Sequence, residues 1–210
     1  PEGRELASLM GQVQNVEADL IAMRGRPTTL KTRFVAGSQQ LLRVDAEEVA
    51  SIGPDIEVKL TGAIHQVAAD AALIILSDYA KGAMTDAVIK AALDAGEAFG
   101  IPVIADPKGR DFRRYGAVDL LKPNGNELAH AFGMPTETDR DAAEALAAAA
   151  KTLPAKAVVV TRAAKGMSFI TQEGEVTHRA GKAREVYDVS GAGDTSIAAL
   201  ALGLAGGGTL

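Results

Sequence analysis

The sequence lacks cysteine and tryptophan altogether, and aromatic residues make up only 4% of its 210 residues. Without cysteine, disulfide bonds, thiolate catalysis and cysteine–zinc sites are all excluded. No apolar stretch approaches the roughly 18–20 residues that span a bilayer, and the chain does not open with a signal-peptide pattern. We therefore expect a cytoplasmic protein that does not act at a membrane.

A surplus of positive charge is also missing. The chain carries 22 Lys and Arg against 27 Asp and Glu, for a net charge of -5, and the basic residues are scattered. A nucleic-acid surface needs basic residues gathered on one face. The local basic run at Arg110–Arg114 is typical of a solvated loop. We expect no nucleic-acid partner.

The composition is that of a chain that can bury a core, with 47% hydrophobic and 23% charged residues. Its length favours a single domain. The chain begins at Pro1 without a methionine and stops soon after an apolar helical pattern. We therefore expect residues 1–210 to be part of one domain, truncated at both ends relative to a longer protein.

From about Ala72 onward, short apolar runs alternate with segments of helical period, which predicts β-α-β units. The runs are continuously apolar, as in parallel strands covered by helices on both faces. An α/β fold with a parallel sheet follows. The expected strands and helices are Leu73–Ser77, Thr85–Phe99 (helix), Pro102–Asp106, Asp119–Lys122, Asp139–Leu153 (helix) and Ala157–Thr161.

Two hairpins are predicted beside this alternation. Gly166–Ile170 and Glu175–Arg179 flank a turn and suit an antiparallel edge of the sheet, before a closing helix that starts near Thr195. Near the start of the chain, Thr28–Val35 and Gln40–Val44 predict a second, charged hairpin. We call it the flap hairpin, at about residues 28–45. Its cations either reach a ligand or are simply solvated.

Ligands of open parallel sheets bind beyond the carboxyl ends of the strands. Here these positions are polar, which predicts a site for an anionic substrate and a metal at one edge of the sheet. Turn and helix-cap chemistry is the alternative at each position, with Asn124 as a helix cap. The polar segments are Ser77–Gly82, Asp106–Gly109, Lys122–Glu127 and Thr161–Arg162.

The sharpest signal is the run Asp188–Thr195, followed by an apolar helical segment. Gly191 and Gly193 allow a close backbone approach, and the unpaired amides of a helix start suit a phosphoryl group. Asp194 lies at this helix mouth, where an ionised aspartate can accept a proton from a hydroxyl. The alternative is that Asp194 or Thr195 caps the helix.

Other phosphate-binding motifs are missing. The sequence has no G-x-x-x-x-G-K-[ST], and no G-x-G-x-x-G follows the first strand. A P-loop enzyme or a dinucleotide oxidoreductase is therefore disfavoured.

The run Asp188–Asp194 resembles the D-T-x-G-A-G-D signature of ribokinase-like (pfkB) carbohydrate kinases, with valine at its second position. Asn124–Glu127 is similar to the family's N-x-x-E motif. Thr161–Gly166 is similar to its nucleotide-binding T-x-G-x-x-G, with Ala163 where the family usually has glycine. The resemblance implies a ribokinase-like three-layer fold and an ATP-dependent kinase that uses magnesium.

Carried over by position, the resemblance implies a catalytic base at Asp194 and an anion hole formed by the amides of Gly191, Ala192 and Gly193. Asn124 and Glu127 would organise Mg²⁺, directly or through water. The nucleotide would lie against Asn124, Thr161 and Gly166. A monovalent cation beside Asp188 is left open.

Within the family, Gln39–Asp45, Ser77–Gly82, Asp106–Phe112 and Glu185–Asp188 resemble kinases of heptose 7-phosphate, which act in lipopolysaccharide-core synthesis. This implies transfer to the anomeric hydroxyl. We expect cations to bind the sugar's own phosphate: Lys81, Lys108, Arg33 and Arg43.

Alternatives remain open at this point. The acceptor could be another sugar, such as a fructose phosphate, or a nucleoside. The family's amino-terminal Gly-Gly strand and its carboxyl-terminal helices have no counterpart in the sequence, so a non-catalytic nucleotide-binding remnant is the alternative from a different class. The projecting flap hairpin favours a homodimer.

Overall fold

The computed structural model describes residues 2–37, 39–172, 174–182 and 191–209. It contains a two-stranded sheet and a six-stranded sheet of order β3-β4-β5-β6-β7-β8. The first sheet is the flap hairpin, β1 (Leu30–Ala36) and β2 (Gln39–Ala46). The second comprises β3 (Ile74–Ser77), β4 (Val103–Asp106), β5 (Leu120–Leu121), β6 (Ala157–Thr161), β7 (Met167–Thr171) and β8 (Thr177–Arg179).

The six-stranded sheet is parallel from β3 to β6 and antiparallel at β7 and β8. The α/β class and the antiparallel hairpin at the sheet edge are thus both confirmed. The four parallel strands are apolar up to a polar last residue in β3, β4 and β6, and β6 is buried from Ala157 to Val160.

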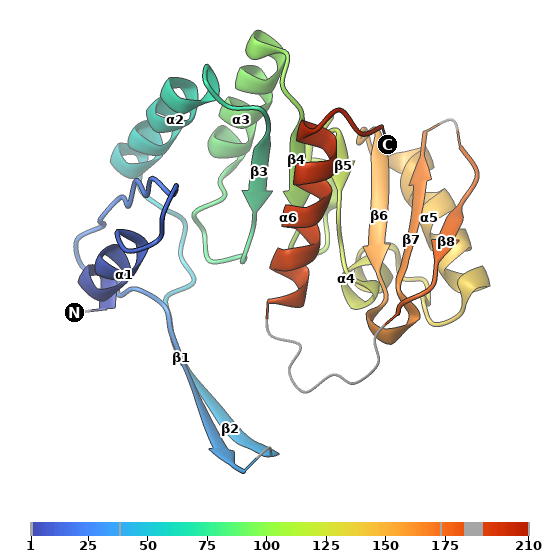
Figure 1. Ribbon diagram of the computed structural model, residues 1–210, viewed down its shortest axis with the longest axis horizontal. Coiled ribbons are helices and arrows are strands. Elements are labelled where there is room, and N and C mark those ends of the chain that lie inside the picture. Colours follow the sequence, from blue (N-terminus) through green and yellow to red (C-terminus); the bar gives the residue numbers. More distant parts are fainter. Residues whose placement is uncertain (1, 38, 173, 183–190, 210) are drawn as a thin grey trace.

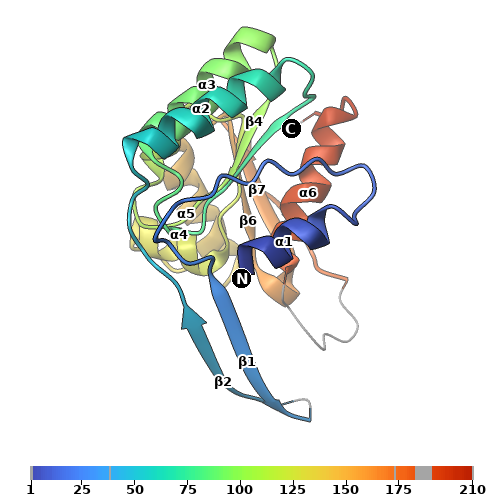
Figure 2. The same ribbon diagram turned by 90° about the vertical axis from the view of Figure 1, so that its left-hand side faces the viewer.

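Helices cover the two faces of this sheet unequally. In Figures 1 and 2, α2 to α5 lie on one side and α6 on the other, with α1 on the side of α6. The architecture therefore has three layers. The helices are α1 (Glu2–Met10), α2 (Pro54–Ala68), α3 (Asp86–Phe99), α4 (Gly125–Phe132), α5 (Asp139–Thr152) and α6 (Ala192–Ala205).

Alternation along each strand divides the core into two clusters. Ala105, Leu121 and Val158 belong to the larger cluster, which packs against α3, α4 and α5. Their neighbours Ile104 and Leu120 belong to a smaller cluster that packs against α6. Successive strand residues point to opposite faces, so a continuously apolar strand serves both clusters.

The face beneath α6 is the less covered one. Ile75, the register partner of Ile104, is 41% exposed, and Leu202 on α6 is 76% exposed. Among the described residues, no helix is long and apolar enough to cross a bilayer.

Local signals explain where the helices start. Thr85 caps α3 by accepting a hydrogen bond from the Val88 amide at 3.3 Å. Asn124 and Thr138 begin α4 and α5 with reciprocal capping boxes. A capping residue satisfies amides that the first helical turn leaves unpaired. The interpretation of Asn124 as a helix cap is therefore confirmed.

The flap hairpin projects from the body of the molecule (Figures 1 and 2). Every residue of β1 is exposed. Its register pairs Phe34 with Leu42 on one face and Arg33 with Arg43 on the other, with an irregularity after Phe34. The hairpin therefore has one apolar and one charged face.

The structure differs from expectation at the closing helix. We expected α6 to start near Thr195, but it begins at Ala192, so Asp194 lies within its first turn. The glycines at positions 191 and 193 suggested a loop, yet Gly193 is helical. Tertiary packing of α6 overrides the low helix propensity of glycine.

Candidate active site

The first turn of α6 lies at the carboxyl ends of the parallel strands (Figure 1). Gly191 is the N-cap, in the left-handed conformation with φ 74°, and among the described residues no side chain caps the helix. The expectation that Asp194 or Thr195 caps α6 is therefore wrong. The amides of the first turn have no partner within the helix, and their dipoles favour a bound anion.

A buried ion pair lies beside this turn. Lys122, whose side chain is 2% exposed, places Nζ 3.1 Å from Oδ2 of Asp106. A Cβ atom on Gly193 would lie 3.9 Å from the same oxygen and 4.0 Å from Nζ. Burial raises the pKa of Asp106, while the ammonium of Lys122 opposes this shift. The start of α6 thus lies across the ends of β4 and β5.

Glu127 connects Asn124, a predicted metal-binding residue, with Lys108, a predicted substrate-binding residue. Its Oε2 accepts a hydrogen bond from the Asn124 amide at 2.8 Å, and its Oε1 is paired with Lys108. Burial lowers the pKa of Lys108, but Glu127 and nearby carboxylates outweigh burial, so the net shift is upward. Asn124, Glu127 and Lys108 therefore form one cluster.

The predicted nucleotide residues lie next to this cluster on β6. Thr161 ends β6 and forms a bridge with Asn124. Gly166 lies beyond it, with φ 91°, and a Cβ atom there would be 2.0 Å from the Arg179 carbonyl oxygen. Glycine is thus required at position 166 by packing. Its contact with a nucleotide stays a prediction.

Lys81 and the flap cations belong to a chain of ion pairs. Glu47 binds Lys81 at 2.5 Å and Lys31 at 3.1 Å, and Asp45 binds Lys31 and Arg43. These bonds, first that to Lys81, lower the pKa of Glu47. Arg43 is thus connected to Lys81 through Asp45, Lys31 and Glu47. Arg33 faces Arg43 across the hairpin.

Sequence reasoning missed Tyr79 as a neighbour of Asp194. The Tyr79 hydroxyl donates a hydrogen bond to Oδ1 of Asp194 at 2.9 Å. This bond, and burial to a smaller degree, raise the pKa of Tyr79. The position of Tyr79 just after a strand was a signal, but it did not reveal a partner 115 residues away in the sequence.

Asp78 lies in the predicted polar segment Ser77–Gly82, but sequence reasoning gave it no role. Its side chain is 3% exposed and accepts hydrogen bonds from the Tyr115 hydroxyl at 2.7 Å and from Arg114 at 3.2 Å. Burial, and then the bond to Asp78, raise the pKa of Tyr115. A buried, fully bonded aspartate of this kind fixes the loop that carries Tyr79.

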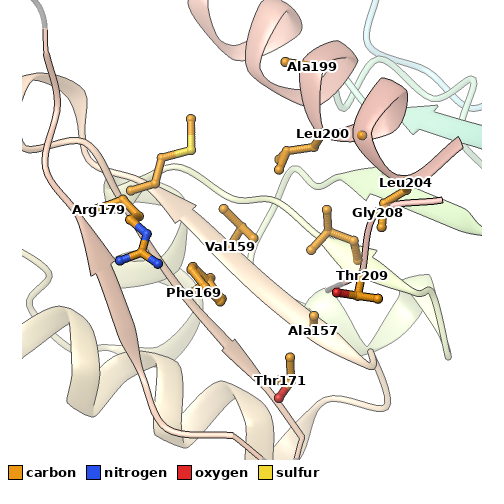
Figure 3. Close-up of a pocket in the computed structure, with 13 residues that line it drawn as sticks. Ala157, Val159, Phe169, Thr171, Arg179, Ala199, Leu200, Leu204, Gly208 and Thr209 are labelled. Atoms are coloured by element: carbon orange, nitrogen blue, oxygen red, sulfur yellow. The ribbon is translucent and has the colours of Figure 1, made fainter. Parts of the chain in front are cut away.

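The apolar pocket in Figure 3 lies elsewhere, between the sheet and the later turns of α6. It has a volume of about 350 Å³ and is lined by residues such as Val159, Phe169 and Leu204. Its lining residues include neither Asp194 nor the cluster of Asn124, Glu127 and Lys108, so it is separate from both.

Part of the family-like signature, Asp188–Ser190, lies outside the described residues, as does Glu185–Tyr187. In the part of the chain that the structure describes, no group of three or more His, Asp or Glu side chains comes together to hold a metal ion.

A family model described as "pfkB family carbohydrate kinase" matches residues 2–210. The chain belongs to this family. The family assignment agrees with the three-layer fold and with the Gly-Ala-Gly-Asp turn at the start of α6.

The chain is similar to two proteins named "Bifunctional protein HldE". That of Hyphomonas neptunium is 57% identical over 208 residues, which are 99% of this chain and 43% of the relative. That of Azorhizobium caulinodans is 49% identical over 193 residues, which are 92% of this chain and 40% of the relative. The chain thus spans less than half the length of these relatives.

Solved structures show the same fold. Phosphofructokinase-2 from Escherichia coli in complex with potassium has a TM-score of 0.80 at 22% identity, over 98% of this chain and 66% of that one. Arabidopsis thaliana ribokinase complexed with ribose and ATP has a TM-score of 0.67 at 24% identity, over 88% of this chain and 59% of that one.

Proposed function

We propose that the protein transfers the γ-phosphoryl group of ATP to a sugar hydroxyl, with Asp194 as the general base. The observation that carries this proposal is the position of Asp194 in the first turn of α6, at the carboxyl edge of the sheet. Asp194 takes the proton of the hydroxyl, whose oxygen attacks the γ-phosphorus while the bond to ADP breaks. Phosphoryl transfer depends mainly on positioning and charge stabilisation.

The anion hole consists of the amides of Gly191, Ala192 and Gly193. Two features support it: the positive end of the α6 dipole, and the lack of a capping side chain among the residues that the structure describes. The nearby Lys122 is paired with Asp106, so the field at this turn combines a cation, a carboxylate and the helix end.

Magnesium fits as an ion held mainly by ATP and water. Mg²⁺ commonly binds one or two carboxylates, several waters and the substrate phosphates. Glu127 supplies a carboxylate, with Asn124 beside it, and Asp106 is close enough for Glu127 to raise its pKa. When bound, the ion would neutralise charge on the transferring phosphates. Thr161 and Gly166 would face the nucleotide.

The acceptor we propose is heptose 7-phosphate, phosphorylated at its anomeric hydroxyl on the route to ADP-heptose and the lipopolysaccharide core. Support comes from the motifs Ser77–Gly82 and Asp106–Phe112 and from the two similar HldE proteins. Another phosphosugar or a nucleoside is the second candidate, since the solved neighbours include a phosphofructokinase.

The sugar's phosphate would be bound by Lys81 and Lys108, with Arg33 and Arg43 approaching from the flap hairpin. Each of the two lysines follows a strand of the six-stranded sheet, and each is paired with a carboxylate that a phosphate would replace. The charged face of the hairpin is joined to Lys81 through Glu47.

We also propose that two copies pair through the apolar face of the flap hairpin, where Phe34 and Leu42 are 50% and 55% exposed. Such a face gains free energy when it is removed from water. Because ATP and sugar phosphates are cytoplasmic, we place the reaction in the cytoplasm. A monovalent cation beside Asp188 stays a prediction.

The test is ADP release by the natural protein, given ATP, Mg²⁺ and heptose 7-phosphate, with fructose 6-phosphate and adenosine as rival acceptors. Turnover with the heptose is expected. Turnover only with another acceptor keeps the kinase and rejects the sugar. ATP binding without turnover on any acceptor would identify a nucleotide-binding remnant and overturn the proposal.

A further inference from the structure

The loop between β3 and α3 is anchored at its start. Buried Asp78 accepts bonds from the Ala80 amide at 2.7 Å, from the Tyr115 hydroxyl at 2.7 Å and from Arg114 at 3.2 Å. A buried carboxylate with this many donors resists displacement, because its removal would leave those donors unpaired. The residue that follows, Tyr79, therefore leaves the sheet in a defined direction.

The same loop is anchored at its far end. The guanidinium of Arg26 donates to the Lys81 carbonyl and, at 2.9 Å, to the Ala50 carbonyl. The Gly82 carbonyl accepts a bond from the Ile52 amide at 3.0 Å. A Cβ atom on Gly82 would lie 1.9 Å from the Ala50 oxygen, so the two segments are in direct backbone contact. Tyr79 thus lies between two fixed points.

The phenol of Tyr79 meets the proposed base from this loop. Its hydroxyl lies 2.9 Å from Oδ1 of Asp194, and the side chain remains 56% exposed. We propose that Tyr79 is a positioning residue, whose phenol holds Oδ1 and leaves Oδ2 of Asp194 to take the proton of the sugar hydroxyl. This inference rests on the proposed function, and it names a residue that determines the rate of phosphoryl transfer.

The phenol suits this role because it donates without carrying charge. The bond to Asp194 and burial raise the pKa of Tyr79, so the hydroxyl keeps its proton at neutral pH. A cation at this position would stabilise the carboxylate more strongly and weaken it as a base. During the reaction the sugar proton passes to Oδ2, while the phenol proton stays on Tyr79.

Other charged groups surround the pair and remain unchanged in the test below. Asp106 and Lys122 lie beside the first turn of α6, and Lys108, paired with Glu127, interacts electrostatically with Tyr79. A change confined to the phenol hydroxyl therefore removes its bond to Asp194, together with a smaller interaction with Ser77.

The test is Tyr79→Phe in the natural protein, assayed by ADP release with the phosphosugar that the wild type uses. We expect kcat to fall about 10- to 100-fold, the range for losing a hydrogen bond to a charged group. The KM values of ATP and sugar should stay within about twofold, because the proposed bond is to the base and not to either substrate.

The matched variant is Tyr115→Phe, which removes the other hydroxyl that anchors this region. Tyr115 is fully buried and bonded to Asp78, so this variant should lower Tm, whereas Tyr79→Phe should not. Comparing the two variants separates a loss of stability, seen as a lower Tm, from a loss of positioning, seen as a lower kcat at unchanged Tm.

Several outcomes would overturn the inference. Unchanged kcat would show that the phenol does not serve the base, and increased kcat would show that it blocks the acceptor site. A rise in the sugar KM alone would assign the phenol to substrate contact. If wild-type protein turns over and Tyr79→Phe matches it, this inference fails alone; if wild-type protein never turns over, the proposed function fails with it.

Discussion

The flap hairpin and the six-stranded sheet are both built from strands with apolar residues, yet they bury them very differently. Leu120 and Val160 in the sheet are 0% exposed, whereas Phe34 and Leu42 in the hairpin are 50% and 55% exposed. Burial of apolar surface supplies most of the stability of a fold. The sheet therefore holds the molecule together, and the hairpin is free to serve a ligand or a second copy.

The two regions are also joined in different ways. The sheet is joined to its helices by packed side chains, while the charged face of the hairpin reaches the loop after β3 through Glu47, which bridges Lys31 and Lys81. Ion pairs at a solvated surface contribute only about 0–1 kcal/mol each. Substitutions in the two regions should consequently change different measured quantities.

The largest effect on stability should come from Leu146→Ala in α5. Leu146 is 0% exposed and belongs to the larger core cluster. Removing its side chain should lower the free energy of unfolding by about 2–5 kcal/mol, through lost burial and a residual cavity. Denaturant unfolding of the variant and the wild type measures this directly.

The matched control is Leu42→Ala in the flap hairpin, the same substitution at a 55% exposed position. Its effect on the unfolding of a monomer should stay within about 0.5 kcal/mol. An equal loss of unfolding free energy in Leu42→Ala and Leu146→Ala would contradict this difference between hairpin and sheet, because Leu42 would then be as important to the stability of the fold as a core residue.

A smaller effect is expected on substrate binding. Lys81→Ala should raise the sugar KM about tenfold, as for one lost charge-assisted bond to the phosphate, and leave the ATP KM nearly unchanged. Arg33→Ala should act in the same direction if the hairpin reaches the sugar. Steady-state kinetics with each substrate varied in turn measures both constants.

Lys90→Ala provides the control for these cations. Lys90 is 72% exposed on α3, where it pairs with Asp94 four residues later. It should leave both KM values unchanged. Equal rises in the KM of ATP and sugar for Lys81→Ala would remove this lysine from the sugar site.

The smallest effect concerns Ala163, which has φ 50° in the turn between β6 and β7. A side chain in the left-handed region costs roughly 1–2 kcal/mol, while glycine costs more entropy on folding. Ala163→Gly should therefore raise the free energy of unfolding by about 0.5–1 kcal/mol. Ala145→Gly, within α5, should lower it by about 1 kcal/mol. If Ala163→Gly also lowered the free energy of unfolding, the left-handed backbone of Ala163 would not be a source of strain.

Much of the sheet could be predicted because its strands are short, apolar and punctuated by local signals. The expected strand Ala157–Thr161 matches β6, and Thr85 begins the helix at the expected place as its cap. These features depend on periodicity and on hydrogen bonds within a few residues.

The contacts of the site could not be predicted in the same way. The bond from Tyr79 to Asp194 depends on how α6 lies across the sheet, and the pair between Lys122 and Asp106 depends on the pairing of β4 with β5. No local pattern encodes such a crossing. The departure of Ala163 from the family's T-x-G-x-x-G motif was visible in the sequence. The structure adds that the backbone of Ala163 is left-handed, which explains why glycine is usual at this position.

The start of α6 shows the same limit. Gly191 and Gly193 suggested a loop up to Asp194, because glycine weakens a helix by about 1 kcal/mol. The buried contacts of Ile197 and Ala201 with the sheet offset this cost, and the helix begins at Ala192. This shift of a few residues places Asp194 in the first turn.

The central claim is that Asp194 is the base for phosphoryl transfer, and the most direct measurement is the kcat of Asp194→Asn in the natural protein. The account predicts a fall of about 10²- to 10⁴-fold with an unchanged Tm, because the side chain serves chemistry and does not cap α6. Asp70→Asn, at an exposed position after α2, should retain full activity. An Asp194→Asn protein with wild-type turnover would contradict the account.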